Sequence, residues 1–153
     1  MKKIICCFVI LVFSYQSFSQ QNCDESERNS NAIIAALSAG FLYNTYALIG
    51  SLADGYESNA YDDATLVDLL DAQKQMARNM STLFEKQETD PNLQELGRKE
   101  YLRSVTTIIK EFELQMNLLV KMVQNKSRKN IEAYTTQRRK SWTDISKLMG
   151  VKD

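Results

Sequence analysis

Apolar residues recur at spacings of three and four along most of the chain, and this periodicity predicts helices. The clearest repeat lies in a predicted third helix over 91–124, where three heptads place apolar side chains on one face. Asp90 and Pro91 would supply its N-cap and first-turn proline. The apolar positions are Leu102, Val105, Ile109, Phe112, Met116, Leu119 and Val123.

Two further helices are predicted over 62–86 and 128–149 by the same periodicity. Gln73 interrupts the apolar face of the earlier helix, and Gly150 is expected as the C-cap of the later one. The apolar face over 62–86 comprises Leu66, Leu69, Leu70, Met76, Ala77, Met80, Leu83 and Phe84. The face over 128–149 comprises Ile131, Tyr134, Trp142, Ile145, Leu148 and Met149.

The first predicted helix, over 30–53, differs because the segment from Ala32 to Ala53 carries no formal charge. Such a helix belongs either in a protein core or in a membrane. Polar side chains at its middle, such as Asn44, and acidic flanking residues favour a core helix, so no stable membrane span is expected. Its principal apolar stripe comprises Ile34, Leu37, Phe41, Leu48 and Leu52, extended on one side by Leu42, Tyr46 and Ile49.

Short connections join the four predicted helices, at 54–61, 87–91 and 124–128. Connections of this length favour antiparallel neighbours, so we expect an all-α fold, an up-down-up-down four-helix bundle over 31–150. In that topology the first and third connections share an end. The acidic segment 54–72 should therefore lie near Lys126, Arg128 and Lys129.

The N-terminus has the pattern of a cleaved signal peptide. Lys2 and Lys3 precede an apolar run of ten residues, and Ser17 and Ser19 form a small-x-small cleavage site. We therefore expect residues 1–19 to be removed, 20–30 to form a flexible segment, and the protein to be exported, either periplasmic or secreted. Cys23 would be the one cysteine left, either bridging two chains or remaining an exposed thiol.

Composition excludes several classes of function. Lys and Arg together number 19, Asp and Glu also number 19, and there is no histidine. The balance of charge gives no reason to expect a nucleic-acid partner. The absence of histidine argues against zinc hydrolases, histidine-ligated haem and histidine-dependent triads. No metal, cofactor or catalytic residue is therefore expected.

Three groups of residues are candidate sites. A small-residue face on the first helix, which would pack against a partner protein or a second copy, comprises Ala32, Ala36, Ala39, Gly40, Tyr43, Ala47 and Gly50. A polar pocket between helices would be lined by Asn44, Tyr46, Gln73 and Gln115. A cationic run that would contact anions comprises Arg138, Arg139 and Lys140.

These patterns predict a non-catalytic, exported helical bundle that acts as a scaffold or protein-binding module of the bacterial cell envelope. The alternative is a helical bundle that binds a small ligand or ion, in the inter-helix pocket or at the acidic 54–63 loop. Arg138 occupies an inward or boundary position at heptad spacing from Ile131 and Ile145, where it would need a carboxylate partner or would have to extend its aliphatic stem to keep the charge in water.

Overall fold

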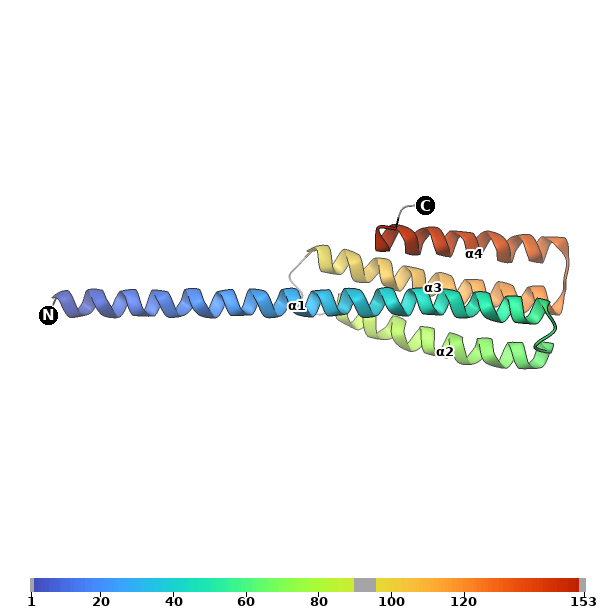
Figure 1. Ribbon diagram of the computed structural model, residues 1–153, viewed down its shortest axis with the longest axis horizontal. Coiled ribbons are helices and arrows are strands. Elements are labelled where there is room, and N and C mark those ends of the chain that lie inside the picture. Colours follow the sequence, from blue (N-terminus) through green and yellow to red (C-terminus); the bar gives the residue numbers. More distant parts are fainter. Residues whose placement is uncertain (1, 90–95, 152–153) are drawn as a thin grey trace. The chain divides into compact units, whose positions relative to one another are not determined.

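A computed structural model describes residues 2–89 and 96–151, with side chains at residue 25, from 28 to 89 and from 98 to 151. The elements are α1 (Lys2–Glu57), α2 (Asp63–Glu88), α3 (Leu96–Gln124) and α4 (Arg128–Met149) (Figure 1). The chain divides into two compact units, Met1–Leu37 and Ser38–Asp153. Within the second unit the four helices pack together around one core. The expected all-α fold with four packed helices is confirmed.

Two side-chain caps and one glycine cap define three helix ends. Asp62 caps α2 by accepting a hydrogen bond from the Thr65 amide at 2.7 Å. Ser127 caps α4 in the same way, and its hydroxyl accepts from the Asn130 amide. Gly150 ends α4 with a left-handed φ of 67°, a conformation that glycine adopts without strain, as predicted.

The extent of α1 differs from that expected. The helical backbone of α1 extends through 20–30 and the segment expected to be cleaved, because no proline or glycine occurs between Lys2 and Ala39 to end it. The side chains of the predicted signal peptide and of Cys23 lie outside the described residues. α3 begins at Leu96, and the predicted start at Asp90 and Pro91 also lies outside the described residues.

Ion pairs and ring contacts give the direction of each helix in the second unit. Glu85 of α2 pairs with Lys110 of α3, and Glu88, further along α2, pairs with Arg103, which is earlier in α3. The two helices therefore run in opposite directions. Lys121 and Glu111 of α3 contact Asn130 and Lys140 of α4, which makes α4 antiparallel to α3. Tyr46 contacts Trp142 and Asp54 contacts Arg138, so α4 is antiparallel to α1 as well.

The α1–α2 and α3–α4 connections lie at the same end of the second unit. The Lys126 ammonium lies 4.6 Å from the centre of the Tyr56 ring, a cation–π contact that joins the two corners. The expected proximity of the acidic segment to Lys126 is therefore confirmed.

The apolar face predicted for α3 is confirmed in full. All seven of its side chains are at most 5% exposed, and those of Phe112, Met116 and Leu119 are completely buried. Charged residues occupy the outer side of this helix, so the boundary between core and solvent was evident from the periodicity.

The rotation of α1 was predicted only in part: Leu52 of the expected principal stripe is buried, but other residues are not where they were expected. Leu42 and Ile49, which were expected on the flank, are completely buried, whereas Leu48 from the expected principal stripe is 43% exposed. The reason is contact with α4: Trp142 and Arg138 pack against the side of α1 that carries Tyr46 and Gly50. This contact turns Leu42 and Ile49 toward the core.

The apolar face of α2 is wider than the core that covers it. Leu66, Leu70 and Ala77 are completely buried, together with the largely buried Gln73 and Ser81. Three apolar residues that were expected on the same face are instead exposed, namely Leu69, Met76 and Leu83. They lie on the flank away from α3, since the other flank carries Lys74 and Arg78, which contact α3.

We expect Phe112→Ala to lower the free energy of unfolding by about 3–5 kcal/mol, because it leaves a cavity in a fully buried part of the core. Leu114→Ala on the same helix is the matched control. Leu114 is 48% exposed, and its truncation should change stability by no more than about 0.5 kcal/mol. Urea denaturation followed by circular dichroism measures both, and equal losses would contradict the assigned core.

Candidate functional site

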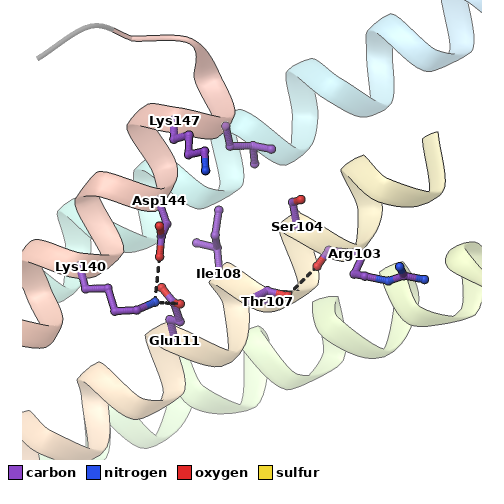
Figure 2. A pocket seen from close by; sticks show the side chains of 9 residues that line it. Arg103, Ser104, Thr107, Ile108, Glu111, Lys140, Asp144 and Lys147 are labelled. Atoms are coloured by element: carbon purple, nitrogen blue, oxygen red, sulfur yellow. Dashed lines mark hydrogen bonds and ion pairs between the residues drawn. The ribbon is translucent and has the colours of Figure 1, made fainter. Parts of the chain in front are cut away.

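A cavity of about 610 Å³ lies between α3 and α4 and opens to solvent (Figure 2). Two polar stripes face each other across it, one from each helix. The α3 side contributes Arg103, Ser104, Thr107, Ile108 and Glu111, and the α4 side contributes Lys140, Asp144, Lys147 and Leu148. A volume of this size is within the range of small-molecule sites.

Short hydroxyl side chains make room for the cavity on α3. Ser104 Oγ donates to the carbonyl oxygen of Glu100 at 2.9 Å, and Thr107 Oγ1 donates to that of Arg103 at 2.8 Å. Both hydroxyl groups are therefore held against their own helix. The apolar side chains of Ile108 and Leu148 complete the lining, so the cavity combines polar and apolar surface.

Lys140 lies between two carboxylates at one side of the cavity, as Figure 2 shows. Its ammonium forms ion pairs with Glu111 of α3 and, at 2.8 Å, with Asp144 of its own helix. Burial raises the pKa of the Glu111 carboxyl, whereas the hydrogen bond from Lys140 lowers the pKa of Asp144. The hydrogen bonds to Asp144 and Glu111 raise the pKa of Lys140.

The two other cations of the cavity differ in their partners. The Arg103 guanidinium is held by Glu88 of α2, with nitrogen–oxygen distances of 2.9 and 2.8 Å. Lys147 forms no ion pair with any residue that the structure describes. Its ammonium is therefore the cation of this cavity that remains available to an anionic ligand.

The four residues predicted to line a pocket do not line this cavity. Asn44 is exposed, while Tyr46 packs on Trp142 with a ring separation of 5.3 Å. Gln73 and Gln115 are buried in the core. The side-chain amide of Gln115 is completely buried and has no hydrogen bond of ordinary geometry in the described part of the chain.

The predicted small-residue face is divided among different surroundings. Gly50 is covered by α4: a Cβ added there would lie only 2.8 Å from Nη2 of Arg138. Tyr43 makes an edge contact with Trp142 at 6.4 Å. Gly40 and Ala47 are exposed, and Ala39 is partly buried. Ala32 and Ala36 belong to the separate N-terminal unit.

The predicted cationic run does not present three free charges. Arg138 pairs with Asp54 at 3.4 Å, which supplies the carboxylate that its position required. Lys140 is engaged by Glu111 and Asp144, and Arg139 is exposed. Two of the three cations are therefore used within the molecule to join α4 to α1 and α3.

The acidic 54–63 loop likewise uses its carboxylates internally. Asp54 pairs with Arg138, Asp62 caps α2, and Asp63 accepts a hydrogen bond from the Tyr56 hydroxyl at 2.9 Å. Among the described residues, no group of three acidic or cysteine side chains is arranged to hold a metal ion.

An uncharged exposed surface was anticipated in part, since Gly40, Tyr43 and Ala47 belong to the small-residue face predicted from the sequence, whereas its α2 part was not. On α1 it comprises Gly40, Tyr43, Asn44, Ala47, Leu48 and Ser51, which we call the α1 surface. On α2 it comprises Thr65, Leu69, Ala72, Met76, Asn79 and Leu83, which we call the α2 stripe. The residues of the α2 stripe follow at intervals of four, three, four, three and four in the sequence. Leu69, Met76 and Leu83 were nevertheless predicted on the same face as the core residues of this helix.

Within the described residues, one segment of α1, Arg28–Glu57, has the length and composition to cross a membrane. Only 22% of its most apolar 18-residue window is buried. Core helices of soluble proteins and signal sequences satisfy the same criterion, so the segment has to be judged from its surroundings.

Of the residues that line the α3–α4 cavity, only Lys140 was among the predicted candidates, because the other polar ones are ordinary charged or hydroxyl residues. A signal was nevertheless present. Ser104, Thr107 and Glu111 follow one another at spacings of three and four, and Lys140, Asp144 and Lys147 at spacings of four and three. Each set occupies one side of its helix, but only the register of the two helices brings them together.

Comparisons with known proteins give no family. No family model matches the chain, and neither the curated proteins nor the solved structures include a match.

We expect the ionisation of Glu111 to lower the free energy of unfolding. Because its pKa is raised above the ordinary 4.5, the folded state holds this proton more tightly than the unfolded state does. Stability should therefore fall as the pH rises from 4.5 through the raised pKa. Glu111→Gln removes this loss, so its stability relative to the parent should improve toward pH 7, by less than about 1 kcal/mol.

Asp144→Asn is the matched control, because the pKa of Asp144 is lowered from its ordinary 3.8. Ionised Asp144 stabilises the fold above pH 3.8, and this contribution is lost as the pH falls through its lowered pKa. The Asn variant should therefore lose stability relative to the parent as the pH rises. Urea denaturation between pH 3 and 7 measures both slopes, and curves parallel to the parent's would contradict the assignment.

Proposed function

We propose that the mature chain is a non-catalytic, exported helical bundle that acts as a scaffold or protein-binding module of the bacterial cell envelope. The observation that carries this proposal is the uncharged exposed surface of the second unit. Leu48 on α1 and three residues of the α2 stripe, namely Leu69, Met76 and Leu83, are each 41–58% exposed. Large apolar side chains that remain exposed in this number mark a place where another molecule binds.

A protein partner suits this surface better than lipid does. Hydrogen-bonding side chains, among them Asn44, Ser51 and Asn79, are interspersed with the apolar ones. In hydrocarbon these groups would lose their hydrogen bonds to water, whereas a protein interface supplies partners and trapped water. Removal of 1–19 as a signal peptide would deliver the bundle to the periplasm or the exterior, in an up-down-up-down topology with no membrane span.

A photoreactive amino acid at position 47, in the middle of the α1 surface, tests this function. In the cells that produce the protein, irradiation should give an adduct between the chain and a second polypeptide. The adduct should contain a chain that begins at Gln20. The same amino acid at position 136, an exposed threonine of α4, should give none. Adducts with lipid alone, or equal adducts at both positions, would overturn the proposal.

A second candidate function, the binding of a small ligand, is favoured by the α3–α4 cavity. Lys147 is available for an anionic group, and Ile108 and Leu148 offer apolar contact. A short-chain carboxylate has both properties.

Hexanoate is a suitable probe for this second function. Calorimetry should detect saturable binding of hexanoate but not of hexylamine, and Lys147→Gln should weaken that binding about tenfold or more, as for loss of a charge-assisted contact. Lys129→Gln, which removes an exposed cation outside the cavity, is the control. Absence of saturable binding by the parent would exclude this probe class.

A further inference from the structure

The α2 stripe has the spacing of a two-stranded helical seam. Its six positions follow at intervals of four, three, four, three and four, and every one of them is exposed. Intervals averaging 3.5 residues keep one line of side chains against a partner helix over three heptads. Leu69, Met76 and Leu83 occupy one position of each heptad, at exposed fractions of 41, 49 and 58%.

The remaining positions of the stripe also suit a helix–helix contact. Thr65 and Ala72 are small, so a partner helix can approach closely beside the larger apolar residues. Asn79 is the polar member, and its Oδ1 already accepts a hydrogen bond from Gln75 at 3.1 Å. Covering Asn79 therefore leaves that acceptor satisfied.

From this seam and the charges beside it, we propose that two copies of the chain associate through antiparallel pairing of their α2 stripes. The proposal rests on the proposed function, since it names the partner at one part of the uncharged surface. The charges decide the occupant and its direction. Asp68 and Lys86 are exposed near opposite ends of the stripe, and neither forms an ion pair with another described residue.

Antiparallel pairing brings these two charges together. When Ala72 of one copy faces Leu83 of the other, Asp68 of each copy comes beside Lys86 of its partner. The symmetry makes the contact occur twice, once at each end of the seam. Parallel pairing would instead place Asp68 beside Asp68 and Lys86 beside Lys86, which is repulsive at both ends.

The other side of α2 cannot take this role. Lys74 and Arg78 contact Asn117 and Glu113 of α3, and Glu85 pairs with Lys110. That flank is therefore already occupied within the bundle. Along the described length of α2, the α2 stripe is the side that combines exposure, the absence of charge along its length and self-complementary charges at its ends.

Light scattering and sedimentation measure the association of the processed chain. Reductant is present so that Cys23 cannot form a disulfide between two copies. The parent should be a dimer. Met76→Glu should give a monomer because it places two charges at the middle of the seam. Leu114→Glu, which alters a comparably exposed (48%) apolar residue of α3, should leave the dimer intact. Circular dichroism shows whether each variant is folded.

Charge reversal tests the direction of pairing. Asp68→Lys alone and Lys86→Asp alone should each weaken the dimer about tenfold at low salt, because each creates two like-charge contacts. The double variant should restore the affinity of the parent. A parent that stays monomeric, a Met76→Glu variant that stays dimeric, or a double variant without rescue would each overturn the proposal.

The two proposals fail in distinguishable ways. A monomeric parent whose position 47 still gives an adduct with another polypeptide would overturn the α2 pairing and leave the proposed function standing. A dimer that responds to charge reversal as described, but with lipid as the only adduct at position 47, would support the pairing and overturn the assignment of the α1 surface to a protein partner.

Discussion

The second unit depends on the burial of the apolar face of α3. Seven apolar side chains from Leu102 to Val123 share that side, and each is at most 5% exposed. Their burial is worth on the order of 10–20 kcal/mol, at about 1.5–3 kcal/mol each. The buried Gln115 amide lies among them and has no hydrogen bond of ordinary geometry to the described residues, which costs at most about 1–3 kcal/mol, so the apolar gain exceeds this cost several times.

The contact between α1 and α4 decides which surface is left outside. Gly50 lets the Arg138 guanidinium lie against the α1 backbone, where Asp54 provides its counter-charge. Trp142 fills the adjoining space beside Tyr43 and Tyr46. These contacts set the rotation of α1 and so decide which of its uncharged residues are exposed. A different rotation would have buried Leu48 and exposed Ile49.

The helices differ in how much of their buried face could be predicted from the sequence. The face of α3 was predictable residue by residue, because charged positions border it on both sides. The rotation of α1 was not, since a helix without charges gives no sign of which side meets water. The broad apolar sector of α2 contains both buried residues and exposed ones, and the sequence pattern did not separate them. The need of Arg138 for a carboxylate was foreseen, but the pairing of Glu111 with Lys140 depends on helix register.

The distribution of charge gives the two sides of the second unit opposite responses to dissolved ions. The side formed by α2, α3 and α4 is joined by exposed ion pairs, such as Arg78 with Glu113. Added salt screens such pairs and loosens that side slightly. The α1 surface and the α2 stripe contain no charged residue themselves, although Asp68 and Lys86 lie beside the stripe, and sulfate or phosphate would strengthen the tendency of their apolar residues to leave water. Concentrated salts of this kind would therefore have two opposite effects. They would favour association through the uncharged surfaces and weaken the ion pairs between α2, α3 and α4.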